Sequence, residues 1–200
     1  MMSITLDRWH AAQALERRYW AEGGPARRAE ERLRRQFYAG LLGITRETVG
    51  GKSVLDLGAG PEGLALQKQE LGLRAAVAVD PLRFSDQDEQ RYADAGVARV
   101  FAAAEELTPG EYDEVWIYNL LQHVRDPVCV VRVAQASARE RIRLFEWVAT
   151  PVTEVHPHST DAVELLGLFE GWHLSVLIGG LYRTPSWEQQ FLALVAERGT

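Results

Sequence analysis

Short apolar runs alternate along the middle of the chain with segments whose apolar residues recur every three or four positions. The short runs predict five strands, at residues 53–57, 75–80, 99–102, 114–118 and 141–148. The recurring segments predict helices at 61–71, towards the end of 85–94, and from Asp126 onward, where an N-cap residue precedes a proline. Such alternation of strands and helices is typical of a parallel sheet.

The region before the first strand reads as helix over residues 5–42. Ala11, Leu15 and Tyr19 recur there at four-residue steps. The Gly-Gly-Pro stretch at 23–25 interrupts the run, and its proline suits the first turn of a second helix. We therefore expect a helical cap in front of the sheet.

After Thr150 the alternation gives way to a different pattern. The pattern predicts a loop at 153–158, a helix at 161–169, a strand at 173–178, a soft point at 179–180, a turn at Pro185-Ser186 and a last strand at 190–195. A closing hairpin of this kind differs from an all-parallel sheet. We expect one domain over residues 1–200, with a helical cap segment at 1–50 and an α/β core at 51–200.

Composition narrows the class of protein. The chain has no apolar run of the roughly 18 residues that a membrane span needs, and its first residues show no secretory signal pattern. A single cysteine, Cys129, fits a reducing cytoplasm. The net charge of −6 argues against a general nucleic-acid binder, although residues 1–40 carry eight Arg against five acids.

The most informative stretch is Val54–Gly63, where a buried strand runs into Gly58, Gly60 and Gly63. Glycines at such a turn let a ligand approach the main chain, and a following helix points free N–H groups at it. Asp80 ends the next strand about 20 residues on, where an acid accepts the hydroxyls of a ribose. The pattern predicts a cofactor of nucleoside type.

Two cofactors suit this pattern. The stretch matches G-x-G-x-x-G, which is typical of dinucleotide binding but weak as a lone motif. Asp56, two residues before the first glycine, would repel a pyrophosphate and suits a cationic amino-acid group. This carboxylate favours a nucleoside that carries a cationic amino-acid group over a nicotinamide cofactor.

Four stretches in this order resemble the class I S-adenosylmethionine-dependent methyltransferases, most closely the branch that acts on small molecules and includes ubiquinone and menaquinone biosynthesis enzymes. The stretches are Val54–Gly63, Val77–Pro81, Ala104–Leu107 and Tyr112–Val124. The resemblance implies a Rossmann-like, seven-stranded, mostly parallel sheet with an antiparallel C-terminal strand, helices on both faces and an N-terminal helical cap.

The resemblance also implies which residues hold the cofactor. Gly58, Ala59 and Gly60 would lie against its methionine part, with Asp56 near the ammonium. Asp80 would accept the 2′ and 3′ hydroxyls of the ribose.

Further along, Pro81 and Leu82 would flank the adenine, and Asn119 and Leu120 would face the sulfonium and its methyl group. The family usually has an Asp after the third strand that contacts the adenine amino group. Ala103 stands at that position here. The adenine contact would then come from the main chain at Ala104 or from Glu105.

Methyl transfer needs an aligned nucleophile and exclusion of water, and a base only where the nucleophile must lose a proton. His123, just past the fourth strand, is the candidate base, since an imidazole titrates near neutral pH. The alternative is that His123 only anchors its loop.

Candidate substrate contacts are Trp20 in the cap, Glu146 in an apolar strand, and His156 and His158 in the loop after it. Glu146 is expected to contact either the substrate or a loop. The two loop histidines could instead bind zinc together with His123 or Glu146, but a single pair is thin evidence and no metal is predicted.

Three rival functions remain open. A nicotinamide dehydrogenase needs a substrate domain that the chain has no residues to build. A nucleic-acid methyltransferase lacks support, because residues 119–122 do not match the Asp/Asn-Pro-Pro-Tyr/Phe stretch of amino-methylating DNA enzymes, and Cys129 is poorly placed to be the nucleophile of cytosine methylation. The Arg-rich residues 27–35 nevertheless keep RNA or a phosphate-bearing substrate as an alternative. A non-catalytic cofactor-binding subunit is the third. The prediction is methyl transfer from S-adenosylmethionine to O, N or C of a small molecule.

Overall fold

A computed structural model describes residues 3–184 and 187–199 of the chain. Its strands are β1 (Ser53–Leu57), β2 (Ala75–Val79), β3 (Ala98–Val100), β4 (Tyr112–Tyr118), β5 (Ala138–Val148), β6 (His173–Thr184) and β7 (Trp187–Glu197). Its α-helices are α1 (Leu6–Leu41), α2 (Arg46–Val49), α3 (Lys68–Leu71), α4 (Asp86–Asp94), α5 (Pro127–Ser137) and α6 (Ala162–Gly167). Among the described residues, none of these helices combines the length and the apolar character needed to cross a membrane.

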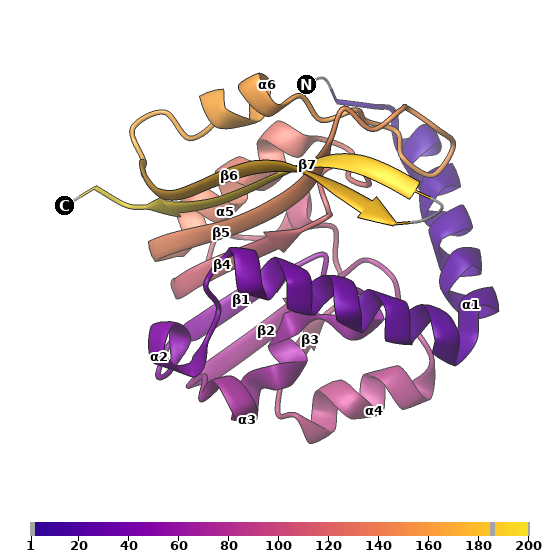
Figure 1. Ribbon diagram of the computed structural model, residues 1–200. Helices are drawn as coiled ribbons and strands as arrows, with labels where there is room; N and C mark the ends of the chain where they lie inside the picture. Colours follow the sequence, from indigo (N-terminus) through magenta and orange to yellow (C-terminus); the bar gives the residue numbers. More distant parts are fainter. Residues whose placement is uncertain (1–2, 185–186, 200) are drawn as a thin grey trace.

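The strands form one seven-stranded sheet in the order β3-β2-β1-β4-β5-β7-β6 (Figure 1). Neighbouring strands from β3 to β5 are parallel, and β7 runs antiparallel to both β5 and β6. Leu57 pairs with Val79 of β2 and Ile117 of β4, so β1 and β2 end level with each other and β4 ends one residue further on. The predicted fold class, mostly parallel with an antiparallel C-terminal strand, is confirmed.

Side chains of β4 alternate between two apolar layers. Trp116 and Tyr118 belong to the layer under α1, α3 and α4, whereas Val115 and Ile117 belong to the layer under α5 and α6. Successive residues of a strand point to opposite faces, so a strand buried on both faces is apolar almost throughout. Helices therefore cover both faces, as predicted.

The cap is formed by α1, which consists of two arms that meet at Gly24 (Figure 1). Gly24 has φ 53° and ψ −154°, a conformation outside the helical region that glycine adopts without strain. The first arm (residues 6–23) stands at one end of the sheet, and the second arm (residues 25–41) crosses a face. The second arm is anchored by Tyr38, which stacks on Phe145 of β5 with ring centroids 3.9 Å apart. The predicted interruption at 23–25 is confirmed.

The predicted helix at 61–71 is wrong in part. The segment instead forms two 3₁₀ turns, η1 (Gly60–Glu62) and η2 (Leu64–Gln67), before α3. Gly63 separates them in an extended conformation, and its N–H is bound by the Tyr92 hydroxyl from α4. A partner distant in sequence therefore interrupts this helix.

The soft point predicted at Gly179-Gly180 is also wrong, because both residues lie inside β6. A Cβ on Gly180 would lie 2.6 Å from Cζ of Phe191 in β7, so that ring occupies the place of a side chain. The turn predicted at Pro185-Ser186 lies outside the described residues.

Candidate functional site

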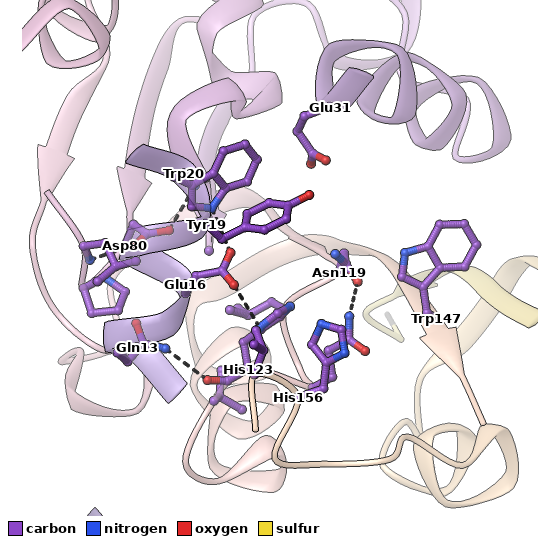
Figure 2. Close-up of a pocket in the computed structure, with 18 of the residues that line it drawn as sticks. Gln13, Glu16, Tyr19, Trp20, Glu31, Asp80, Asn119, His123, Trp147 and His156 are labelled. Carbon is purple, nitrogen blue, oxygen red and sulfur yellow. Dashed lines mark hydrogen bonds and ion pairs between the residues drawn. The ribbon is translucent and has the colours of Figure 1, made fainter. Parts of the chain in front are cut away.

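A cavity of about 680 Å³ opens at the carboxyl ends of β1, β2 and β4, beneath the first arm of α1 (Figure 2). This volume lies within the roughly 300–1,000 Å³ of small-molecule sites. Of the predicted site residues, the following line it: Trp20, Gly58, Gly60, Asp80, Pro81, Ala104, Glu105, Asn119, Leu120, His123 and His156. Asp56, Ala59, Glu146 and His158 do not belong to the lining.

The turn after β1 needs glycine at its first position. Gly58 has φ 66°, and its N–H donates to the carbonyl of Val79 at 2.9 Å. A Cβ at Gly58 would lie 2.5 Å from Cδ1 of Leu120, which enters from the loop after β4. The turn and that loop therefore approach each other closely, and they do so at the cavity wall.

Tyr92 and Asp56 fix the turn from behind. The Tyr92 hydroxyl donates to the Gly60 carbonyl at 2.8 Å and accepts the Gly63 N–H at 3.0 Å. Asp56 Oδ2 accepts the Ala65 N–H at 3.1 Å. Burial raises the pKa of Asp56 to about 6, against the opposing effect of Arg35. Asp56 thus lies behind the turn, where the structure gives it a supporting role.

Asp80 directly follows β2, with both carboxylate oxygens bonded to the main chain. Oδ2 accepts the Gly60 N–H at 3.0 Å and Oδ1 accepts the Leu82 N–H at 2.8 Å. Burial raises the pKa of this carboxyl to about 6, while the two N–H groups act in the opposite direction. The carboxylate is therefore held in one orientation at the edge of the cavity, with lone pairs left for a ligand hydroxyl.

The side chains that line the cavity beyond Asp80 are small and mostly apolar. Pro81, Ala103 and Ala104 line it, so no carboxylate stands at the position where the resembling family has Asp. Glu105 Oε1 accepts the N–H groups of Arg125 at 2.7 Å and of the following residue at 3.0 Å. That oxygen therefore holds the loop before α5, and a contact from Glu105 to adenine remains a prediction.

Arg35, on the second arm of α1, is a site residue that the sequence did not single out. Its side chain is only 6% exposed, and its Nε donates to Glu31 at 2.8 Å. Nη1 is buried without a hydrogen-bond partner among the described residues. Arg35 falls on the same helical face as the buried Tyr38 and Leu42. A charged residue within an apolar helical face is the sequence feature that could have marked Arg35 as a site residue.

The loop after β4 is held by Glu146. Its Oε1 accepts the N–H groups of Leu120 at 2.7 Å and of Leu121 at 2.9 Å, and the side chain is fully buried. Burial raises the pKa of this carboxyl to about 8. Of the two roles expected for Glu146, the structure supplies the contact to a loop and not a place in the cavity wall.

Asn119 begins the same loop with φ 53°, an uncommon conformation that Asn tolerates better than most residues. Its side chain points into the cavity, and Oδ1 accepts a hydrogen bond from Nε2 of Gln122 at 2.6 Å (Figure 2). This bond fixes which way the Gln122 amide faces.

His123 and His156 lie on the side of the cavity away from Asp80, and Glu16 of the first arm lies between Asp80 and His123 (Figure 2). The two imidazoles form an edge contact with centroids 4.7 Å apart, and His123 Nδ1 lies 3.7 Å from Glu16 Oε2. Burial lowers the pKa of each histidine to about 4 and raises that of Glu16. Both rings are therefore neutral at pH 7 with a lone pair available, but the same burial makes them weaker bases than a free imidazole, so the expected titration of His123 near neutral pH is wrong.

His158 lies apart from this group. It is buried, and its Nε2 is hydrogen-bonded to the Val124 carbonyl at 2.9 Å. Within the part of the chain that the structure describes, no three His, Cys, Asp or Glu side chains are arranged to hold a metal ion. The geometry assigns His158 to supporting the loop after β4.

The first arm of α1 covers the cavity and is attached mainly through main-chain oxygens. The Ile4 N–H and the side chains of Arg8 and Gln13 all donate to carbonyl oxygens of the loops after β4 and β5. Trp20 donates from Nε1 to Glu16 Oε1 at 2.7 Å, which orients that carboxylate from within the same arm.

The arginines of the second arm are mostly engaged in ion pairs. Arg28 binds Asp88, Arg32 binds Glu62, and Arg34 binds two glutamates of its own helix. Because these charges are neutralised within the fold, the Arg-rich stretch offers little free positive charge to a phosphate backbone.

Three solved structures similar to this chain are small-molecule methyltransferases. The 1,6-didemethyltoxoflavin-N1-methyltransferase of Burkholderia thailandensis, with its substrate and S-adenosylhomocysteine bound, is 16% identical and has a TM-score of 0.76, covering 100% of this chain and 92% of that one. Magnesium protoporphyrin IX methyltransferase of Synechocystis PCC 6803, with S-adenosylmethionine bound, is 15% identical with a TM-score of 0.70, over 99% and 100%. The N-methyltransferase NodS of Bradyrhizobium japonicum WM9, with S-adenosylhomocysteine, is 13% identical with a TM-score of 0.71, over 95% and 99%.

Neither a scan against models of protein families nor a search of curated proteins gave a match. At these identities the structural likeness concerns the fold. The chain has the fold of the class I S-adenosylmethionine-dependent methyltransferases, as the sequence motifs indicated.

Proposed function

We propose that this protein is a methyltransferase that uses S-adenosylmethionine to methylate O, N or C of a small-molecule acceptor. The observation that carries the proposal is one cavity that joins the glycine turn and Asp80 at one end to a pair of neutral histidines at the other. A cofactor and an acceptor would occupy these two ends.

The residues at the first end suit S-adenosylmethionine. At Gly60 the only atom within 4 Å of a Cβ position is Arg35 Nη2, at 3.7 Å, so the main chain there is open to a ligand, and Asp80 is oriented for ribose hydroxyls. The unpartnered Nη1 of Arg35 would gain a partner in the methionine carboxylate, since a buried cationic donor without one is costly. Asp56 would act from behind the turn, through the charge it places near the ammonium. The cofactor would supply an electrophilic methyl group on sulfur.

The chain's own residues would orient the reactants and take up a proton. Asn119 and Leu120, in the loop held by Glu146, would border the methyl group. The first arm would exclude water from above. Where the acceptor atom carries a proton, His123 would accept it, and the nearby Glu16 would stabilise the imidazolium that forms.

The remaining assignments follow the same scheme. His156 and Trp20 would contact the acceptor or close over it, and Pro81, Ala104 and Glu105 would border the adenine. We further propose a single methyltransferase domain over residues 1–200, with the cap at 1–50 and the core at 51–200, working in the cytoplasm. Oligomeric state is left open.

Calorimetry with S-adenosylmethionine, S-adenosylhomocysteine and NADH tests the cofactor. Arg35→Gln removes the unpartnered donor, while Arg32→Gln on the same helix removes a guanidinium that is half exposed and paired with Glu62. We expect the sulfur nucleosides to bind and the Arg35 variant to lose about 10- to 100-fold in affinity, as for a lost charged hydrogen bond. The Arg32 variant should bind like the parent protein.

Binding of NADH alone would overturn the proposal. Binding of the sulfur nucleosides without turnover of any acceptor would favour the non-catalytic subunit instead. The RNA alternative predicts RNA binding that weakens steeply with salt, which the paired arginines of the second arm argue against.

A further inference from the structure

The cavity end remote from Asp80 has a wall made largely of flat rings. We call it the acceptor end and define it by Gln122, His123, Trp147, His156 and Tyr182. Trp147 projects from β5 across from Asn119, with the two histidines below (Figure 2). Trp147 and Tyr182 pack against each other with ring centroids 5.7 Å apart. Aromatic walls of this kind favour a flat ring as ligand, through stacked or edge contacts.

The acceptor end offers no free cation within the described residues. Of the arginines that line the cavity, Arg34 donates to Glu31 at 3.3 Å and to Glu30 at 2.5 Å. Arg35 lies beside Gly60, whose Cβ position is 3.7 Å from its Nη2, and so belongs to the cofactor end. A phosphate or carboxylate on the acceptor would therefore lose its hydration without gaining a partner.

Two buried hydrogen-bond acceptors at this end lack partners. Gln122 donates from Nε2 to Asn119, which leaves Oε1 unsatisfied, and His123 Nδ1 is unsatisfied as well. Such atoms destabilise the folded protein when they are buried without a donor. A ligand that brings an O–H or N–H into this end relieves that destabilisation, whereas a fully alkylated one does not.

On the premise that the proposed methyltransferase function holds, we propose that the acceptor is an uncharged, flat aromatic compound whose nucleophilic atom is a phenolic oxygen or ring nitrogen that carries a proton. That atom forms the new bond to the methyl carbon, and the carbon–sulfur bond breaks with its electron pair passing to sulfur. The proton passes to Nδ1 of His123. The products are the methylated ring, S-adenosylhomocysteine and an imidazolium that releases its proton to solvent.

Binding of matched probes to protein saturated with S-adenosylhomocysteine tests the acceptor class. The probes are 2-naphthol and 2-quinolinone, which carry a proton on oxygen and on ring nitrogen. Three analogues lack required properties: decahydro-2-naphthol is not flat, 2-methoxynaphthalene has no proton to donate, and 2-naphthyl phosphate has no phenolic proton and is charged, so its comparison with 2-methoxynaphthalene isolates the effect of charge. We expect 2-naphthol or 2-quinolinone to bind at least tenfold more tightly than every analogue, and to be methylated when S-adenosylmethionine replaces the product.

Variants connect the preference to the acceptor end. Trp147→Phe keeps a ring and should weaken 2-naphthol binding several-fold, and His123→Asn should abolish its methylation while leaving S-adenosylhomocysteine affinity unchanged. Trp172→Phe, at a tryptophan outside the cavity, is the control and should change neither.

The possible failures are distinguishable. Saturable binding of S-adenosylhomocysteine, with no preference for the two protonated probes, would overturn the acceptor class and leave the proposed function intact. Equal binding of the phosphate or the saturated analogue would do the same. Failure to bind S-adenosylhomocysteine would overturn both proposals together.

Discussion

Replacing Glu146 by Gln tests whether this buried carboxyl is neutral in the folded protein. In the structure its Oε1 accepts two main-chain N–H groups of the loop after β4, whereas Oε2 is buried without a hydrogen-bond partner among the described residues. A glutamine has nearly the same shape and can accept both hydrogen bonds. We therefore expect Glu146→Gln to fold with little loss of stability at pH 6.

The size of the effect follows from the pKa of Glu146. Burial raises it to about 8 from an ordinary value of 4.5, so between these pH values the folded protein binds a proton that the unfolded chain has released. Stability from this group is thus present at low pH and is lost as pH rises towards 8. Each unit of pKa difference corresponds to about 1.4 kcal/mol, which gives a loss of about 2 kcal/mol between pH 6 and pH 8.

Urea unfolding of the parent protein and the variant at pH 6 and pH 8, followed by tryptophan fluorescence, measures this loss. Other titrating groups act equally in both proteins, so the difference between the two pH dependences isolates Glu146. We expect the variant to lose about 2 kcal/mol less than the parent over this range. Parallel pH dependences would refute the reasoning, because they would show that Glu146 is already ionised at pH 6 in the folded state.

Three further predictions concern the turn and the histidine. Gly58→Ala and Gly51→Ala both place alanine at positive φ, but only the alanine at 58 meets Leu120. In urea unfolding, Gly58→Ala should therefore lose about 1–3 kcal/mol more stability than Gly51→Ala. Equal losses would contradict the contact. Tyr92→Phe should cost about 1–3 kcal/mol and weaken S-adenosylhomocysteine binding in calorimetry, since two main-chain groups of the turn lose their partner; unchanged values would show that the hydroxyl is dispensable. Burial lowers the pKa of His123 to about 4, so between pH 6.5 and 4 the unfolded chain binds a proton that the folded protein does not. In this range the free energy of unfolding of the parent should fall by about 1 kcal/mol more per pH unit than that of His123→Asn. Identical acid denaturation curves would count against a buried neutral ring.

Local signals in the sequence predicted the sheet and one end of the cavity. An apolar strand, a glycine turn and an acid at the end of the next strand lie close together in sequence, and the parallel register brings Gly58 and Asp80 to the same edge. The sheet and this end of the cavity depend only on residues close together in sequence and on the order of the strands. The alternation of strands and helices along the chain indicates that order.

The parts that could not be predicted depend on segments that meet only after folding. The break in the helix at 61–71 is fixed by Tyr92 from α4, and the continuous β6 by Phe191 from β7. Glu16 approaches His123 only because the first arm crosses the end of the sheet. A single sequence shows the type of each residue but not these encounters.

The attachment of the first arm has a consequence for how such proteins diverge. Its anchoring groups at Ile4, Arg8 and Gln13 are received by carbonyl oxygens of the loops beneath, and every amino acid supplies a carbonyl. Under the proposed function, side chains in those loops can therefore be exchanged, and the choice of acceptor altered, while the main-chain bonds to the arm are kept. The covering of the cavity then depends on main-chain groups, whereas acceptor specificity depends on side chains. Acceptor specificity would therefore be able to change by a few substitutions at a time while the arm still covers the cavity.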